Sequence, residues 1–203
     1  MPIKVLAILV LSFILHGCGG WNYKVINESV KFEISSWNHD PIIKNVENAD
    51  FSTFISLGNG YGSDKKSVFY KGDEVYKANP KSFHILGNGY SKDSRHVFLW
   101  DHPIKSADPN TFVILEGLWS KDNNHVFNAY EKVNADSASF KYLKNSWAVD
   151  KDNAYHALSW YPSLTEPAVI VFKNIDTETF RVIDGFNAKD RNRKYDALKT
   201  PNK

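Results

Sequence analysis

Short runs of apolar residues alternate with polar, turn-forming residues along most of the chain. The run FHIL at 83–86 is followed by a Gly-Asn-Gly turn, and the run HVFLW at 96–100 comes after a turn that begins with an aspartate. Valine, phenylalanine and tryptophan suit the pleated surface of a sheet, whereas glycine, asparagine and aspartate accept turn dihedral angles or hydrogen-bond their own backbone. The pattern therefore predicts short β-strands joined by tight turns.

The turns recur at a fixed spacing. The string YSKDSRHVF at 90–98 has a near copy, WSKDNNHVF at 119–127, and the aspartates of the two strings are 29 residues apart. Four copies carry Phe or Tyr five residues after an Asp, and a fifth copy is weaker. The aspartates are Asp64, Asp93, Asp122, Asp150 and, in the weaker copy, Asp190. Self-similarity at a period of this length is typical of a repeat array.

A second marker runs in phase with the first, and it is an Asp or Asn four residues before a Phe. The marker residues are Asp50, Asn79, Asp108, Asp136 and Asp176. An Asp or Asn can accept a backbone N–H bond at a helix start. Proline follows the marker in two copies, at Pro80 and Pro109, where its missing N–H would have no partner anyway. The marker predicts a one-turn helix or a 3₁₀ turn in each unit.

A unit of about 29 residues, with about three short strands and one turn, cannot bury its own aromatic face. Neighbouring units must therefore stack, and the predicted fold class is an all-β repeat array with short antiparallel strands in stacked units. Composition agrees, because 42% hydrophobic and 14% aromatic residues supply a sizeable core in a chain of 203 residues. The net charge of +2 gives no field that would attract a nucleic-acid partner.

The N-terminus carries the marks of an export signal. Lys4 precedes the apolar stretch from Val5 to Leu15, which is too short to span a bilayer as a helix. The single cysteine of the chain, Cys18, follows in the string LHGC. This string resembles the lipobox of bacterial lipoproteins, in which the cysteine becomes the first mature residue. Residues 1–17 are therefore interpreted as a lipoprotein signal peptide.

The lipobox resemblance implies a lipid anchor and a location. Cys18 would carry a diacylglyceryl thioether and an acylated amine, and two or three acyl chains attach a protein stably where one is marginal. Gly19 rather than Asp follows the cysteine, which by resemblance to sorted lipoproteins favours the outer membrane of the bacterial cell envelope. The simpler alternatives are a small residue that ends a signal peptide and a buried free thiol. Residues 18–48 are interpreted as an anchor linker with a half-unit.

The repeated strings also resemble a known family. SKDSRHVF at 91–98, with ADPNTF after it, and SKDNNHVF at 120–127 are similar to the aspartate-lysine-asparagine-tyrosine pattern of the DKNYY family. Members are bacterial repeat proteins, many of them lipoproteins. The resemblance covers roughly 49–155 well and 175–196 loosely, and 49–203 is interpreted as the repeat domain. It implies a scaffold and no particular reaction.

An aspartate and a histidine three residues apart, Asp122 and His125, could form an acid/base pair. Such a pair needs a unique site, yet other copies place Ser67, Asn153 or Arg193 at the position of the histidine. This comparison favours a polar turn residue over a catalytic one. The chain also has no serine-hydrolase elbow, zinc-protease, phosphate-loop or dinucleotide motif. We therefore predict no catalytic residue and no cofactor, with a non-enzyme favoured over an enzyme.

Stacked units would align the repeated carboxylates in one column. The aspartates concerned are Asp64, Asp93, Asp122 and Asp150. Like charges directly opposite one another are destabilising unless something offsets them. The preferred explanation is the neighbouring lysines, which are Lys65, Lys92, Lys121 and Lys151. The alternative is a hard cation such as Ca²⁺, which needs about six to eight oxygen ligands. These aspartates are thus candidates for structural turns or for cation binding.

The regular spacing breaks once, between Phe140 and Phe180, which are 40 residues apart. The extra residues, near 157–167, include the aromatic pair Trp160 and Tyr161. Insertions in repeat proteins map to loops, often on the binding face, so this pair is a candidate contact for a sugar ring or a protein partner. The alternative is that the pair covers the end of the array as a cap.

These features predict a cell-envelope lipoprotein whose repeats form a non-catalytic binding or structural module. Its predicted partners are the membrane, through lipidated Cys18, and an envelope protein or glycan. The alternative function is a hydrolase or an inhibitor that acts on cell-wall carbohydrate through the loop of Trp160. An acidic pair beside Trp160 would favour the hydrolase, whereas acids evenly spaced along one edge would favour the module.

Overall fold

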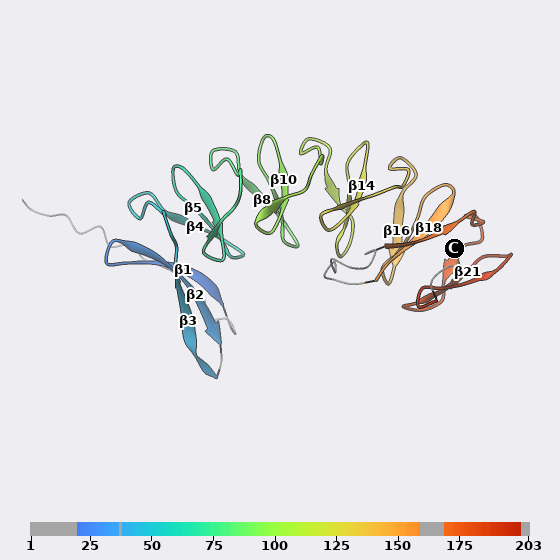
Figure 1. The fold of residues 1–203 in the computed structure, drawn as a ribbon, viewed down its shortest axis with the longest axis horizontal. Coiled ribbons are helices and arrows are strands. Elements are labelled where there is room, and N and C mark those ends of the chain that lie inside the picture. Colours follow the sequence, from blue (N-terminus) through green and yellow to red (C-terminus); the bar gives the residue numbers. More distant parts are fainter. Residues whose placement is uncertain (1–19, 37, 159–168, 200–203) are drawn as a thin grey trace, which may run out of the picture.

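The chain folds as a row of small sheets in the computed structural model, which describes residues 20–36, 38–158 and 169–199. Within these ranges there are 22 β-strands in six antiparallel sheets, which follow one another in chain order. Figure 1 shows the sheets side by side along an arch, from the first (blue) to the last (red). The predicted all-β repeat fold is confirmed. No helix long and apolar enough to cross a membrane occurs in these ranges.

Each sheet is a meander in which every strand pairs with its neighbour in sequence, and a sheet with the turn before it is here called a unit. The first sheet contains β1 (Trp21–Ile26), β2 (Ser29–Ser36) and β3 (His39–Asn45), and the second contains β4 (Ile55–Gly58), β5 (Tyr61–Ser63), β6 (Val68–Tyr70) and β7 (Asp73–Glu74). The third contains β8 (His84–Gly87), β9 (Tyr90–Lys92), β10 (Val97–Leu99) and β11 (His102–Pro103), and the fourth contains β12 (Val113–Ile114), β13 (Trp119–Lys121), β14 (Val126–Asn128) and β15 (Glu131–Val133). The fifth contains β16 (Lys141–Lys144), β17 (Trp147–Val149), β18 (Asn153–Ala157) and β19 (Val169–Lys173), and the sixth contains β20 (Arg181–Val182), β21 (Asn187–Lys189) and β22 (Lys194–Asp196).

Tight hairpin turns fix the register inside a unit. Between β8 and β9, Asn88 and Gly89 have positive φ angles of 51° and 82°, as in a type I′ turn, whose twist matches that of the flanking strands. Glycine is also required at Gly89 because a β-carbon there would lie 2.4 Å from Nε1 of Trp100. Asn59 and Gly60 form the same turn between β4 and β5, with φ angles of 51° and 80°.

The predicted one-turn helix is a single hydrogen-bonded turn in the structure. The N–H of Thr53 donates to the carbonyl of Asp50 over 3.1 Å, and the N–H of Thr111 donates to that of Asp108 over 3.3 Å. These bonds join residues three apart, as in a 3₁₀ turn. The turn does not extend, because the chain enters the first strand of the next sheet directly after the marker Phe, and no helix is assigned among the described residues.

The hydrophobic core runs continuously from unit to unit. Phe98 of β10 is 0% exposed and packs in one cluster with Val68 of β6 and Tyr61 of β5. Since these strands belong to different sheets, an aromatic residue of one unit completes the core of the unit before it. Phe69 does the same one unit earlier, where it packs with Tyr23 of β1. Stacking of neighbouring units thus buries their aromatic faces, as predicted.

Hydrogen bonds from aromatic side chains also tie each of the first four units to the next. The donor and acceptor pairs are Tyr23 with Gly60 (3.0 Å), Tyr61 with Gly89 (3.1 Å), Tyr90 with Leu118 (2.9 Å) and Trp119 with Ser146 (3.3 Å). In each pair a hydroxyl or indole N–H donates to a backbone carbonyl of the following unit. A slip of one unit against its neighbour would leave these polar groups unsatisfied in the interior, so the bonds hold the stack in register.

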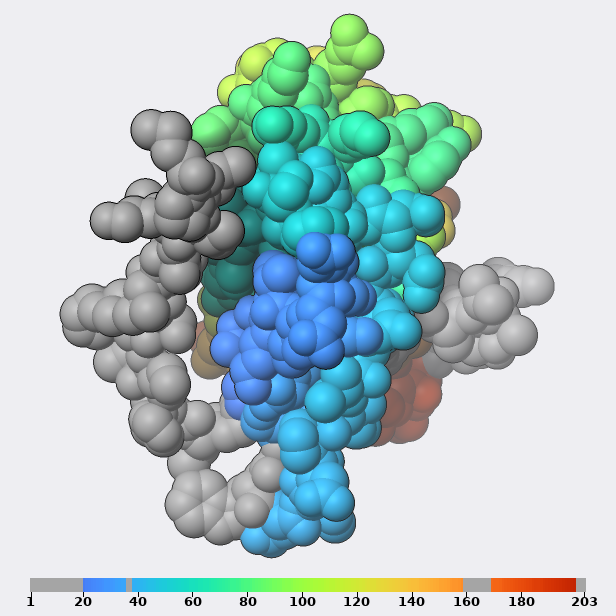
Figure 2. All heavy atoms as spheres, turned by 90° about the vertical axis from the view of Figure 1, so that its left-hand side faces the viewer, coloured from blue at the N-terminus to red at the C-terminus, as the bar shows by residue number. Residues whose placement is uncertain are grey.

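The first sheet covers the N-terminal end of the arch. The strands β1, β2 and β3, within the segment interpreted as a linker and half-unit, form a three-stranded sheet in which Tyr23, Val30 and Phe32 are buried. Figure 2 looks onto this end and shows the sheet (blue) in front of the following units. Phe69 of the second unit packs against it. The sheet therefore acts as an end unit of the array.

Candidate functional site

The repeated aspartates lie in buried turns, and Asp93 illustrates their use. Asp93 is 3% exposed and stands between β9 and β10. Its Oδ1 accepts hydrogen bonds from the backbone N–H groups of Arg95 and His96, both at 2.7 Å, which closes the turn. Its Oδ2 accepts the N–H of Asn79, a marker residue 14 positions earlier, at 2.9 Å. One carboxylate therefore joins the two repeated markers of the sequence.

The same carboxylate link recurs in the other four copies. The links from marker N–H to aspartate Oδ2 are Asp50 to Asp64 (2.8 Å), Asp108 to Asp122 (2.9 Å), Asp136 to Asp150 (3.0 Å) and Asp176 to Asp190 (2.9 Å). The five aspartates are between 2% and 8% exposed. Turn closure is thus a shared architectural role that uses the acids of every copy.

Backbone N–H groups offset the charge of these carboxylates. Burial raises the pKa of Asp93, but three backbone N–H groups outweigh it and hold the pKa below its usual value. Lys92 does not pair with Asp93, because its Nζ donates to the carbonyl of Pro109 at 2.8 Å. Nζ of Lys121 likewise donates to the carbonyl of Ser137 at 2.8 Å. Lys92 and Lys121 therefore bind backbone carbonyls. Lys151, whose pKa is raised mainly by Asp152, also interacts with the charge of Asp150.

Calcium binding by the aspartate column stays an untested alternative. Both carboxylate oxygens of Asp93 already accept N–H bonds, and those of Asp64, Asp122 and Asp150 do the same. Over the residues that the structure describes, no three His, Cys, Asp or Glu side chains come together in an arrangement that could hold a metal ion. The hydrogen bonds of these carboxylates support a structural role of the aspartates in the turns.

The Asp122 and His125 pair belongs to the same kind of turn. Nδ1 of His125 lies 3.5 Å from Oδ1 of Asp122, which is long for a hydrogen bond. That oxygen accepts the backbone N–H groups of Asn124 at 2.8 Å and His125 at 2.6 Å. A general base needs a lone pair that is directed at a substrate proton. The carboxylate of Asp122 is instead directed at its own turn.

Acidification is expected to destabilise the array through these turns. Asp93, Asp150 and Asp190 have pKa values below the ordinary 3.8, since hydrogen bonds to the carboxylates outweigh burial. A group whose pKa is lower in the folded state stabilises the fold above its unfolded pKa, and this contribution disappears as the pH falls through the folded pKa. Urea unfolding at a series of pH values should therefore show a steeper loss of stability below about pH 4.

The variant Asp93→Asn isolates this contribution, because it cannot ionise at that position. The difference in unfolding free energy between the wild-type chain and the variant should narrow as the pH falls below about 4. A difference that stays constant down to about pH 2 would contradict a lowered pKa at Asp93.

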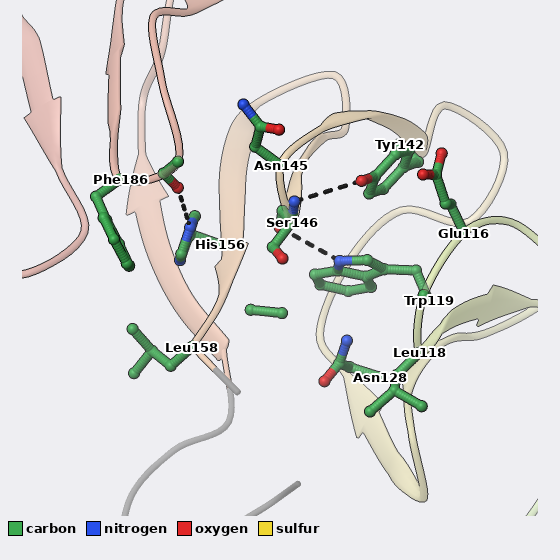
Figure 3. A pocket seen from close by; sticks show the side chains of 13 residues that line it. Glu116, Leu118, Trp119, Asn128, Tyr142, Asn145, Ser146, His156, Leu158 and Phe186 are labelled. Carbon is green, nitrogen blue, oxygen red and sulfur yellow. Dashed lines mark hydrogen bonds between the residues drawn. The ribbon is translucent and has the colours of Figure 1, made fainter. Parts of the chain in front are cut away.

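A pocket of about 480 Å³ lies toward the C-terminal end of the arch, where residues of the fourth, fifth and sixth units meet. Its volume falls within the range of about 300–1,000 Å³ that is typical of small-molecule sites. Leu118 and Asn128 of the fourth unit, Tyr142 and His156 of the fifth and Phe186 of the sixth contribute to its walls (Figure 3). The pocket therefore depends on the stacking of three units.

His156 is held as a neutral ring on one wall of the pocket. It is 2% exposed, and its Nε2 lies 2.7 Å from the carbonyl oxygen of Gly185. A carbonyl only accepts, so Nε2 carries the proton and Nδ1 has the lone pair. Burial lowers the pKa of His156, although the bond to Gly185 acts in the opposite direction. Nδ1 has no hydrogen-bond partner.

Asn128 stands across the pocket from His156, as Figure 3 shows. It is 2% exposed, and its Nδ2 also has no hydrogen-bond partner. Buried polar groups are nearly always hydrogen-bonded. Unpaired ones also occur at His96, Ser120, His125 and Trp147, but Asn128 and His156 line one pocket together, which makes it the candidate binding site. The sequence carried a signal that was missed: both residues stand six positions after the aspartate of their unit, where the third unit has the apolar Leu99.

Three residues predicted to carry function lie outside the described part of the chain. They are Cys18, the predicted lipid attachment, and Trp160 and Tyr161, the predicted ligand contacts. In chain order Trp160 comes two residues after Leu158, which lines the pocket. Their roles stay predictions.

Comparison with known proteins concerns the scaffold. The model of the DKNYY family matches residues 61–199, which is more than half of the chain and runs from β5 to the end of the sixth unit. No curated protein matches, and no solved structure does. The matched residues contain four of the five carboxylate links from aspartate to marker N–H. The chain belongs to the DKNYY family.

Proposed function

We propose that the chain is a cell-envelope lipoprotein whose array serves as a non-catalytic binding or structural module. The observation that carries this proposal is the use of the repeated acids. Each carboxylate closes a turn of its own unit, and the acids follow the spacing of the units along the arch. Acids that recur in every unit and are bonded within it support an architectural role rather than a role in a reaction.

The pocket supports the module over the alternative of a carbohydrate hydrolase. Most glycoside hydrolases use two carboxyl groups that flank the scissile bond. Glu116 is the single acidic side chain among the described residues that line the pocket. A binding role needs no such pair, and an envelope protein or a glycan is the proposed partner.

The proposed attachment to the membrane is a lipidated Cys18, with the outer membrane as the proposed location. β1 begins at Trp21, three residues after the cysteine. A lipid on Cys18 would therefore hold the first sheet close to the membrane surface. The basis for this part of the proposal is the lipobox resemblance of the string LHGC.

Cys18→Ala is expected to release the protein from the membrane fraction and to cause the precursor to accumulate. The reason is that the variant lacks the thiol to which the lipid is attached. Fractionation of cells that express the full chain, combined with metabolic labelling by radioactive palmitate, measures both effects. Gly19→Ser keeps the cysteine and is the matched control, which should stay labelled and membrane-bound. Normal membrane retention of Cys18→Ala would refute the anchor.

A further inference from the structure

We infer that the pocket between Asn128 and His156 binds an uncharged, hydroxyl-rich ligand of the size of a mono- or disaccharide. This inference deepens the proposed binding role and rests on it. Its starting point is the comparison of equivalent positions in neighbouring units. Six residues after its aspartate, the third unit has Leu99, which is 0% exposed, whereas the fourth and fifth units have Asn128 and His156. The equivalent residues are Tyr70 in the second unit and Asp196 in the sixth, so the position is polar in the three units that form the pocket.

The next position along the chain provides the space. In the third unit it is Trp100, whose indole packs over Gly89 of the hairpin turn in the same unit. In the fourth and fifth units it is Ala129 and Ala157, and Ala157 lines the pocket. The sixth unit likewise has Asp196 and Ala197, so a polar residue and an alanine occupy these positions in all three units that meet at the pocket. A polar residue and an alanine at these positions leave space that Leu99 and Trp100 fill in the third unit.

The two unpaired nitrogens require opposite partners. Nδ2 of Asn128 is a donor and needs an acceptor, whereas Nδ1 of His156 is an acceptor and needs a donor. An anion offers acceptors only, and an ammonium group offers donors only, so neither can form hydrogen bonds with both nitrogens. A hydroxyl group both donates and accepts, and a sugar carries several of them in fixed geometry.

The rest of the lining agrees with an uncharged ligand. No Lys or Arg is among the described residues that line the pocket, so an anionic ligand would meet Glu116 with no cation to offset it. Leu118, Tyr142 and Phe186 supply apolar surface, as Figure 3 shows. Such surface suits the C–H face of a sugar ring, while the polar walls orient its hydroxyl groups.

The test uses the full chain, purified in a detergent without a sugar headgroup. Glucose, N-acetylglucosamine and their disaccharides are titrated by calorimetry and by saturation-transfer NMR. We expect saturable binding of at least one of these sugars to the wild-type chain. Asn128→Leu restores the residue type of Leu99 and should weaken that binding by about tenfold or more. It should also preserve or raise Tm, because it removes an unpaired buried amide; a lowered Tm would mean that Asn128 has a structural role.

Two further variants complete the test. Ala157→Trp restores the residue type of Trp100 and should abolish binding by filling the pocket. Asn45→Leu makes the Asn-to-Leu change on β3, outside the pocket, and should leave binding unchanged. Absence of binding by all of the sugars, or binding that survives both Asn128→Leu and Ala157→Trp, would overturn the inference. Because binding is measured on purified protein, this outcome is separate from loss of membrane retention in Cys18→Ala, which concerns the proposed anchor.

Discussion

Replacing Asp93 by alanine is expected to lower the free energy of unfolding by about 3–5 kcal/mol. The variant leaves the N–H groups of Asn79, Arg95 and His96 without their acceptor. Each buried polar group that loses its partner costs about 1–3 kcal/mol, and water that reaches the outer side of the turn recovers part of this. Urea denaturation at neutral pH, followed by circular dichroism, measures the change.

Arg95→Ala is the matched control for Asp93→Ala. Arg95 is exposed and lies in the same turn, and the variant keeps the backbone N–H that bonds to Asp93. Its effect should stay within about 0.5 kcal/mol, as for most surface substitutions. Asp93→Asn retains one acceptor oxygen, so its loss of unfolding free energy should lie between those of Asp93→Ala and Arg95→Ala. If Asp93→Ala were as mild as Arg95→Ala, the carboxylate would not be what holds the turn to its marker.

Phe98→Ala is expected to lower the free energy of unfolding by about 3–5 kcal/mol, because it leaves a cavity in a packed core. Phe98 is 0% exposed, and its ring lies 6.1 Å from that of Phe83 between centroids. The same urea experiment gives the magnitude. Tyr76→Ala removes an aromatic ring that is 59% exposed and should change the stability by about 0.5 kcal/mol or less.

The position of Phe98 also predicts which strands lose local stability in Phe98→Ala. Because this side chain completes the core of the second unit from the third, amide hydrogens of β5, β6, β9 and β10 should all exchange faster in Phe98→Ala. In a repeat array each unit contacts only its neighbours, so β21 and β22 should keep their protection. Faster exchange confined to β9 and β10 would contradict the shared core.

The turns and the unit boundaries could be predicted from the sequence because the rules that govern them are local. An aspartate closes a turn with N–H groups two and three residues later, as Asp93 does with Arg95 and His96. Asn88 and Gly89 are residue types that adopt positive φ angles in hairpin turns, whatever their distant contacts. Because these local residue patterns recur in successive units, the repeat period could be recognised without any knowledge of the packing.

Features that depend on contacts between distant residues could not be predicted in this way. The bond from Asn79 to Asp93 spans 14 residues, and its existence depends on how the intervening hairpin folds back. The side chain of Lys92 reaches a carbonyl of the next unit, so its partner is fixed by the stacking. The pocket residues Asn128 and His156 are polar in sequence, but only the three-dimensional stack shows that they face each other across one space.

The carboxylate links have a consequence for how the chain folds and how its length can evolve. The link at Asp93 spans 14 residues, and the bond from Tyr90 to Leu118 spans 28. Closing such short loops costs little chain entropy, and low contact order goes with rapid folding. A gene duplication that inserts one whole unit would bring its own link and meet compatible neighbours on both sides. The reach of the arch can therefore change in steps of one repeat while its two end units stay the same.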